Sequence, residues 1–278
     1  MFTIIRKKAL NNDVTLMEIE APDISRKAKP GQFIIYRIDE QGERIPLTIA
    51  DTNPETGTVT IIFQQVGAST KMLAALSEGD SILDFVGPLG SPSHLEGIER
   101  ACIIGGGVGC AIAYPQAKEL HRRGAAVDVI VGFRSKELVI LEDEFREVCD
   151  NFYITTDDGS YGEKGFVTDR LKALLDAGNV YDEVIAIGPV PMMKFVSKLT
   201  KEYDVKTTVS LNPIMIDGTG MCGGCRVTVG GEVKFACVDG PEFDGHQVDF
   251  DELMHRNSFY QEQERGHACR LTGGMANG

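Results

Sequence analysis

The sequence predicts a mixed β and α/β fold, in which an antiparallel β-barrel precedes a parallel-sheet domain and a small C-terminal segment. Three observations support this prediction. Short β-branched runs fill the first part of the chain, strands and helices alternate in the middle, and the last part has closely spaced cysteines and little periodicity. A chain of 278 residues has room for two or three domains. We expect domains at residues 1–97, 98–211 and 212–278.

The first domain is predicted from short apolar runs separated by turn clusters, such as those at residues 29–31 and 51–54. Six strands at this spacing, with one helix at about 69–76, are typical of a small antiparallel barrel. A segment rich in glycine and proline at 87–92 indicates the end of this domain. The expected strands are residues 2–5, 14–19, 32–38, 46–50, 58–65 and 81–85.

The second domain is predicted from apolar strands that alternate with helical stretches. This order favours a parallel sheet covered by helices on both faces, with a ligand crevice at the carboxyl ends of the strands. The expected strands are residues 101–104, 127–132, 152–155, 183–187 and 206–210, and the expected helices are residues 113–123, 138–149, 166–176 and 190–202.

Composition narrows the class of protein. The chain has 28 basic and 41 acidic residues, for a net charge of −13, which argues against nucleic acid or an anionic membrane as a partner. No apolar run reaches the roughly 20 residues that span a bilayer, and the first residues lack the pattern of a signal peptide. Three of the seven cysteines are closely spaced, which suits a reducing compartment. We therefore expect a cytoplasmic protein.

The most specific motif lies in the C-terminal segment. Cys222, Cys225 and Cys237 follow the spacing of plant-type [2Fe–2S] proteins, and Asp217 stands where the first cysteine would be. A carboxylate is also an anionic donor and can bind ferric iron. Zinc is the main alternative, because C-x2-C opens many zinc sites, and inert buried thiols are the third reading. We expect these four residues to bind a [2Fe–2S] cluster and the other cysteines to be bystanders: Cys102, Cys110, Cys149 and Cys269.

A glycine-rich turn follows the first strand of the predicted α/β domain. Glycines at such a turn let backbone amides approach a pyrophosphate at the start of a helix. The run departs from G-x-G-x-x-G at Cys110, so a purely structural turn is the alternative, and Pro115 predicts that the regular helix starts near residues 113–115. We predict that a nicotinamide nucleotide binds along Gly105, Gly106, Gly107, Val108 and Gly109.

Two further strand ends bear on the nucleotide. Arg134 follows the second strand, where an arginine can meet the 2′-phosphate of NADP, although a solvated basic turn is an equal alternative. Gly188 and Pro189 follow the fourth strand and would allow close approach of the nicotinamide ribose, although this pair is also an ordinary helix start.

Residues 44–48 and 67–70 of the barrel, taken with the α/β half, resemble the ferredoxin–NADP reductase superfamily. Its flavin motif is R-x-[YF]-[ST], which Leu47 and Thr48 follow at the last two positions, while Arg44 lies one residue before the arginine position. The resemblance implies that the barrel binds FAD, with Thr48 at the flavin ring. The implied FAD residues are Arg44, Pro46, Leu47, Thr48, Ile62, Phe63, Gln64, Gly67, Ser69 and Thr70.

The cluster motif after the nucleotide domain narrows the resemblance to the electron-transfer subunits of dihydroorotate dehydrogenase. Asp217, with residues 209–217, 239–244 and 248–256, is more similar to the small subunit of electron-bifurcating NADH-dependent ferredoxin:NADP oxidoreductase, also called sulfide dehydrogenase. The resemblance implies a flavin-dependent oxidoreductase subunit that uses FAD, a [2Fe–2S] cluster and NAD(H), with NADP(H) left open.

It also implies a heterodimer with a larger flavin and iron–sulfur subunit, through which ferredoxin is reached indirectly. The reaction chemistry would reside in the cofactors, so we expect no general acid or base. Two alternatives stay open: a dihydroorotate dehydrogenase subunit, and a non-enzymatic regulator on a reductase scaffold that has lost its cofactors.

Overall fold

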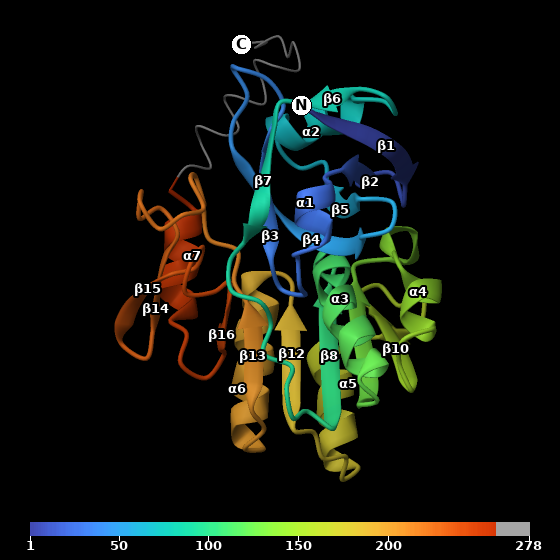
Figure 1. Cartoon of the computed structure of the whole chain (residues 1–278). Coiled ribbons are helices and arrows are strands. Elements are labelled where there is room, and N and C mark those ends of the chain that lie inside the picture. The colour runs from blue at the N-terminus through green and yellow to red at the C-terminus, as the bar shows by residue number, and fades with distance from the viewer. Residues whose placement is uncertain (260–278) are drawn as a thin grey trace, which may run out of the picture.

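In the computed structural model, which describes residues 1–259, an antiparallel sheet forms the first half (Figure 1). Its strands are β1 (Phe2–Ala9), β2 (Val14–Glu20), β3 (Phe33–Arg37), β4 (Ile45–Asn53), β5 (Thr58–Gln64), β6 (Ser81–Ile82) and β7 (Asp84–Leu89). They are ordered β6-β1-β2-β5-β4-β3-β7. Because β6 and β7 are the two edges and only Leu83 separates them, the sheet nearly closes into the predicted barrel.

The side-chain alternation of the strands decides which residues fill the barrel. On β5, Ile61 and Phe63 belong to the barrel core, whereas Ile62 belongs to the core shared with the α/β half. A short helix, α1 (Pro22–Ser25), was not predicted, and α2 (Ala68–Ala75) agrees with the predicted helix. The outer face of β4 and β5 is therefore turned toward the second half of the chain.

The second sheet contains β8 (Arg100–Gly106), β9 (Ala126–Phe133), β10 (Asn151–Thr156), β11 (Glu163–Lys164), β12 (Glu183–Ile187), β13 (Thr207–Ser210) and β16 (Glu242–Asp244). Their order is β11-β10-β9-β8-β12-β13-β16, and all neighbours are parallel except β16. The strands β8, β12 and β13 point toward the barrel (Figure 1). The carboxyl ends of this sheet, where ligands bind in such folds, thus meet the barrel.

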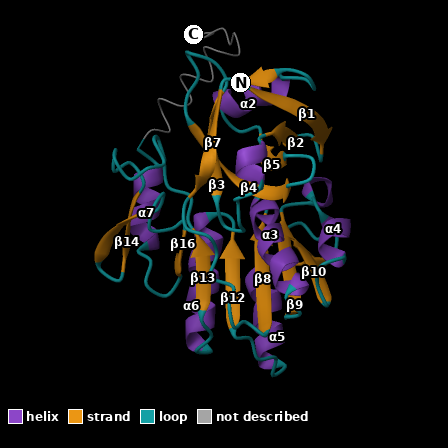
Figure 2. Ribbon diagram, viewed as in Figure 1, coloured by secondary structure: helices purple, strands orange, loops and turns teal. Residues whose placement is uncertain are grey.

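Helices cover both faces of this sheet, as predicted (Figure 2). The core on one face includes residues of α3 (Gly109–Arg122) and α4 (Glu142–Arg146). The core on the other face includes residues of α5 (Val167–Asp176) and α6 (Val190–Glu202). The helices α3, α5 and α6 each bury an apolar stripe against the sheet, which is the main source of their stability, and the short α4 buries Phe145.

Two predicted helix boundaries in this half were wrong. The helix α3 begins at Gly109, and Pro115 lies inside it, because a buried stripe that includes Ala111 and Leu120 holds both sides of the proline against the sheet. The stretch predicted as a helix at 138–149 is a 3-10 turn, η1 (Lys136–Leu138), followed by the short α4. Leu141 adopts a left-handed backbone with φ of 57°, which separates the two.

The C-terminal segment is more ordered than its weak periodicity predicted. A hairpin of β14 (Arg226–Val229) and β15 (Glu232–Phe235) precedes β16, which joins the second sheet. A final helix, α7 (Phe250–Asn257), starts at Asp249, whose carboxylate accepts a hydrogen bond from the backbone N–H of Glu252 at 2.9 Å. An aspartate at this position is a sequence signal for a helix start.

The parts of the chain share their cores. One core contains Phe33 and Ile35 from the barrel, residues of the second sheet, and Cys225 and Cys237 from the C-terminal segment. The other contains Ala50 and further barrel residues beside α3. This burial holds the barrel, the sheet and the cysteine segment in one arrangement. No helix in residues 1–259 is long and apolar enough to cross a membrane.

Candidate functional site

The four predicted cluster donors form two pairs. Asp217, Cys222 and Cys225 lie on the loop before β14, and Cys237 lies on the turn after β15. Cys225 and Cys237 place their sulfur atoms 3.2 Å apart, and both residues are buried. Asp217 and Cys222 are the more exposed pair, and the Asp217 carboxylate accepts a hydrogen bond from the backbone N–H of Cys222 at 2.9 Å. Across residues 1–259, no three histidine, cysteine or acidic side chains converge on one metal ion. The donors thus form pairs rather than one single-ion cage.

The two pairs differ in electrostatics. Backbone N–H groups, first that of Thr219 and then that of Cys222, lower the pKa of Asp217, so this carboxylate is a ready anionic donor. Burial, and then the neighbouring Cys225 thiol, raise the pKa of Cys237 to about 12. Two buried thiols this close ionise together only when positive charge lies beside them, which is the charge that ferric iron supplies. The donor set therefore fits a [2Fe–2S] cluster.

The loop that carries Asp217, Cys222 and Cys225, here called the cluster loop, lies directly against the barrel. Gly218 has φ of 75°, and a Cβ added there would come within 2.6 Å of Ile35 Cδ1 and 2.9 Å of Leu89 Cδ1. Arg44 Nε donates a hydrogen bond to the carbonyl oxygen of Ile216 at 3.1 Å. Only glycine allows the loop to approach β3 and β7 this closely. Arg44, predicted to meet the flavin, thus contacts the residue before Asp217.

The predicted bystander cysteines belong to the second half of the chain. Cys102 on β8 and Cys110 on α3 are fully buried, and burial raises the pKa of each thiol well above its ordinary value. Burial also raises the pKa of Cys149 to about 11. These thiols are protonated at neutral pH and are poor metal ligands in that form. Cys269 lies outside the described residues.

The predicted FAD residues of β4 and β5 divide between the two faces of the barrel wall. Leu47 is partly buried against the barrel core, and Phe63 is a buried part of it, so Phe63 offers a ligand only its backbone. Pro46, Thr48 and Gln64 alternate with inward residues and are partly exposed, and Ile62 faces the α/β half. The Thr48 hydroxyl makes no hydrogen bond within the described part of the chain. The outer face therefore carries a free hydroxyl on an apolar wall.

The start of α2 brings the other predicted FAD residues together. Gly67 precedes the helix, and a Cβ added there would meet nothing within 4 Å, so its surroundings are open. Thr70 Oγ1 accepts a hydrogen bond from the backbone N–H of Gly67 at 3.1 Å. The buried Ser69 donates its hydroxyl to the Glu43 carboxylate. The free N–H groups of the first helical turn suit a phosphate, although Glu43 would have to turn away from it.

The two glycine turns predicted to hold the nucleotide lie against each other. A Cβ on Gly106 would come within 2.4 Å of Met192 Sδ, and a Cβ on Gly109 within 2.5 Å of the carbonyl oxygen of Ile187. A Cβ on Gly188 would lie 3.0 Å from the Cα of Gly106. These glycines are therefore required for packing of the β8–α3 turn on the β12–α6 turn.

Gly107 differs from its neighbours in this turn. It has φ of 56°, and a Cβ added there would meet nothing within 4 Å. The turn is thus both structural, as the alternative reading held, and open to a ligand at one residue. Gly105 packs on Cys110, the residue that departs from the dinucleotide pattern. Val108 and Pro189 flank the two turns as residues before α3 and α6.

Arg134 stands directly after β9, at the carboxyl edge of the sheet. Its side chain is exposed and forms no ion pair or hydrogen bond with the rest of residues 1–259. Asp158 donates its backbone N–H to the Arg134 carbonyl oxygen at 3.3 Å, which fixes the backbone and leaves the guanidinium free. Arg134 can therefore meet an anion at this edge.

Comparison with known proteins shows the family to which the chain belongs. The iron–sulfur cluster binding domain of dihydroorotate dehydrogenase B matches residues 212–249. A protein of Thermotoga maritima, named as a homolog of the electron transfer subunit of dihydroorotate dehydrogenase B (NAD(+)), is 49% identical over 262 residues, or 94% of this chain and 92% of the relative. The chain belongs to the family of dihydroorotate dehydrogenase B electron-transfer subunits and their homologues. This confirms the resemblance inferred from the motifs.

Two further matches place the chain within the family. A solved chain of NADH-dependent reduced ferredoxin-NADP oxidoreductase, studied for flavin-based electron bifurcation, is 47% identical, with a TM-score of 0.93 and coverage of 98% of both chains. An uncharacterized protein in the adh 3′ region of Clostridium beijerinckii is 58% identical over 272 residues, covering 95% of this chain and 92% of the relative. The oxidoreductase match covers the barrel, the second sheet and the cluster segment together.

Sequence reasoning missed a polar junction between the three parts of the chain. Glu242 on β16 accepts hydrogen bonds from Ser93 Oγ at 2.7 Å and from Gln116 Nε2 at 2.8 Å. Gln116 is fully buried, and its Oε1 receives no hydrogen bond from the part of the chain that the structure describes. Burial raises the pKa of Glu242. A buried glutamine within an apolar helix stripe was the available signal.

Proposed function

We propose that this chain is the electron-transfer subunit of a flavin and iron–sulfur oxidoreductase. It moves electrons between NAD(H) and a larger partner subunit through FAD and a [2Fe–2S] cluster, as in NADH-dependent ferredoxin:NADP oxidoreductase. The observation that carries the proposal is the contact of the cluster loop with the barrel at Ile35 and Leu89, beside two pairs of cluster donors. This contact supports a short path from a barrel-bound flavin to the cluster.

The barrel would hold FAD along its outer face. Thr48 would donate its free hydroxyl to the flavin ring, and the side chains of Pro46 and Ile62 would form the apolar wall beside it. The N–H groups at the start of α2, with Thr70 close by, would bind the pyrophosphate. Arg44, on the loop before β4, would approach the cluster loop and the FAD phosphates from the same side.

The α/β domain would present NADH to this face. The open Gly107 would admit the pyrophosphate, and the contact of Gly106 with Gly188 would let the nicotinamide end approach the flavin without intervening side chains. Arg134 would lie at the adenosine ribose. We propose NADH as the preferred nucleotide, with NADPH as the alternative that Arg134 would favour.

Bound FAD accepts a hydride from a nicotinamide and passes single electrons to a cluster, so one subunit that holds both converts two-electron into one-electron chemistry. The chain itself would bind, orient and exclude water. Cys225 and Cys237, both buried, would shield one side of the cluster, and the exposed Cys222 would leave the other side accessible. No side chain is proposed as a general acid or base.

A dihydroorotate dehydrogenase subunit is the second candidate, since several relatives carry that name. Asp217 favours the first candidate, because the dihydroorotate enzymes that the motif resembles use four cysteines. Purification of the native complex distinguishes the two. A large partner with its own flavin and iron–sulfur centres supports the proposal, whereas a dihydroorotate-oxidising partner supports the alternative.

The same preparation tests the cofactors. A yellow-brown protein that yields FAD and iron on extraction supports the proposal, and colourless protein would support a regulator that has lost its cofactors. Extraction of FMN or of zinc without iron would contradict it. We also propose a cytoplasmic location, supported by the closely spaced cysteines, and fractionation of source cells tests it.

A further inference from the structure

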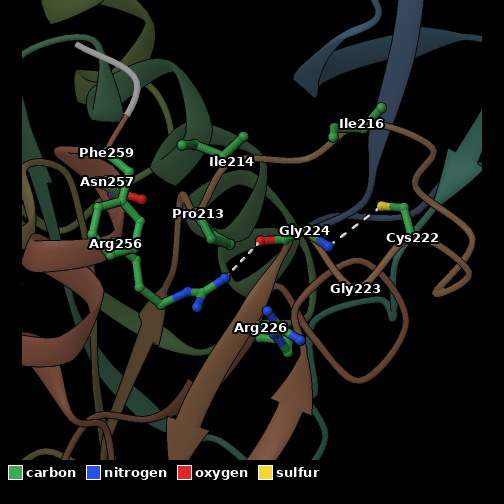
Figure 3. Close-up of a pocket in the computed structure, with 10 residues that line it drawn as sticks. All are labelled: Pro213, Ile214, Ile216, Cys222, Gly223, Gly224, Arg226, Arg256, Asn257 and Phe259. Carbon is green, nitrogen blue, oxygen red and sulfur yellow. Dashed lines mark hydrogen bonds between the residues drawn. The ribbon is translucent and has the colours of Figure 1, made fainter. Parts of the chain in front are cut away.

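A pocket of about 350 Å³ borders the cluster loop (Figure 3). Its wall includes the exposed Cys222, two arginines, Arg226 and Arg256, and the apolar side chains of Ile214 and Phe259. Arg226 begins β14, directly after a candidate cluster ligand, and Arg256 lies on α7. The cluster loop and the last helix thus form one concave surface beside the exposed candidate ligand.

Both arginines lack an acidic partner within residues 1–259. The Arg256 side chain donates only to the carbonyl oxygen of Gly224, at 3.4 Å, and the Arg226 side chain forms no ion pair or hydrogen bond there. Most other arginines of residues 1–259 form an ion pair with an acidic side chain, as Arg37 does with Asp84 at 2.6 Å, and Arg44 and Arg134 are the exceptions. With a net charge of −13 available, two cations left facing one pocket indicate an anionic group from outside the described residues.

The pocket also contains an acceptor without a donor. Asn257 Oδ1 is buried and receives no hydrogen bond from any described residue, while its amide nitrogen donates to the carbonyl oxygen of Asn212 at 3.3 Å. A buried acceptor without a donor is costly. A simple anion would satisfy the arginines but not Asn257. A peptide segment offers both a carboxylate and a backbone N–H.

Exposed apolar side chains surround the cluster donors. Ile216, Met221 and Val238 are 54%, 86% and 44% exposed, and each is adjacent in sequence to a candidate ligand. Large apolar side chains grouped in this way are typical of a surface that another protein covers. A polar pocket at the edge of an apolar surface suits a charged anchor on that protein.

We propose that this pocket is the docking subsite for an acidic side chain of the larger partner subunit. Arg226 and Arg256 bind its carboxylate, Asn257 accepts a hydrogen bond from the neighbouring backbone, and the apolar side chains around the cluster donors pack on the surrounding surface. The inference rests on the proposed function, because it requires the partner. It adds the chemistry of the contact.

The test is the affinity of the cofactor-loaded chain for its partner, measured at several salt concentrations. The variants are Arg226→Gln, Arg256→Gln and Arg256→Glu, with Lys27→Glu as the control, because Lys27 is an exposed cation in the barrel half that forms no ion pair within residues 1–259. Each arginine variant is expected to weaken binding about tenfold or more, since a charge-assisted hydrogen bond is lost. The salt dependence of the affinity is also expected to be smaller in the arginine variants than in wild type. Lys27→Glu is expected to leave the affinity unchanged.

Iron content and flavin reduction by NADH are measured on each isolated variant. Weaker binding with both properties retained supports the docking subsite. Unchanged affinity in all three arginine variants, equal weakening by Lys27→Glu, or weakening only where iron is lost would overturn it. It also fails if affinity is unchanged while protease access to residues 260–278 increases, because Glu262 or Glu264 of the chain itself then fills the pocket. A wild-type chain that NADH does not reduce contradicts the proposed function instead.

Discussion

At the scale of single residues, Asp217 carries the most specific chemistry. Hydrogen bonds from Thr219 and Cys222 hold its carboxylate in the loop and lower its pKa, so it is ionised at neutral pH. The other donors are thiols, two of them buried 3.2 Å apart. A hard oxygen donor on one side of the cluster and soft sulfur on the other would make the two iron sites unequal.

We therefore expect Asp217→Cys to keep iron and to change the visible spectrum, because a thiolate replaces the oxygen donor. Asp217→Ala should lose most of its iron, since one anionic ligand is missing. Asp251→Ala, at an exposed aspartate of α7, is the control and should match wild type. Iron analysis and absorbance spectra decide. An unaltered cluster in Asp217→Ala would remove the aspartate from the ligand set.

Arg134 is the second residue with a separable role. If NADPH binds, its 2′-phosphate would gain a charge-assisted contact of about 1.5–3 kcal/mol from this free guanidinium, or about tenfold or more in affinity. We expect stopped-flow reduction of the flavin to be faster with NADH, and Arg134→Ala to slow only the NADPH reaction. Faster reduction by NADPH, lost in Arg134→Ala, would overturn the preference for NADH.

At the scale of elements, the two glycine turns position the nucleotide domain. Gly109→Ala should destabilise the protein by about 3 kcal/mol, since its Cβ would lie 2.5 Å from the carbonyl oxygen of Ile187, which cannot move freely. Gly107→Ala is the matched variant. It should cost about 1–2 kcal/mol for its left-handed backbone and should weaken NADH binding more than Gly109→Ala does.

Thermal unfolding and NADH titration of both variants give the comparison. Equal effects of the two substitutions on nucleotide affinity would mean that Gly107 does not face the ligand.

The elements that the sequence predicted well are those whose apolar pattern matches their burial. The barrel strands and the α/β strands have short, bounded, β-branched runs, so their fold follows from pattern alone. The prediction of one helix at 138–149 was wrong, because the left-handed backbone of Leu141 separates η1 from α4. Apolar residues pack on both sides of this break, so the apolar pattern alone did not indicate it. The strand β16 was not predicted, because its three residues are too few to show an alternating apolar pattern. Its pairing with β13 is a tertiary contact that no local pattern indicates.

The residues of the candidate site also fall into those that the sequence pattern predicted and those that required the structure. Motif spacing predicted Asp217 and its three cysteines, because local chain geometry brings cluster donors together. The outward face of Thr48 and the packing of Phe63 inside the barrel required the register of β4 and β5. The pocket at Arg226 and Arg256 and the junction at Glu242 join segments far apart in sequence, so no local pattern indicated them.

At the scale of the whole molecule, Glu242 links the cluster segment to the linker at Ser93 and to α3 through Gln116. Burial raises the pKa of Glu242 above its ordinary value of 4.5, so the folded protein binds this proton more tightly than the unfolded chain. The stabilisation is fully present below the unfolded pKa, and it is lost as the pH rises through the folded pKa.

The thermal midpoint of Glu242→Gln, measured relative to that of wild type, should therefore increase as the pH rises from about 4.5. The neutral amide cannot lose a proton, so it keeps the junction uncharged. Glu232→Gln, an exposed partner of Lys234, is the control and should show no such trend. A difference between wild type and Glu242→Gln that does not vary with pH would contradict a titrating Glu242.

The central claim is that one chain converts hydride transfer into single-electron transfer. Anaerobic titration of the cofactor-loaded chain with NADH, followed by flavin absorbance and by electron paramagnetic resonance, tests it most directly. We predict that NADH bleaches the flavin and that the signal of a reduced [2Fe–2S] cluster appears in the same titration. A flavin that NADH does not bleach, or that bleaches while the reduced cluster gives no signal, would contradict the account.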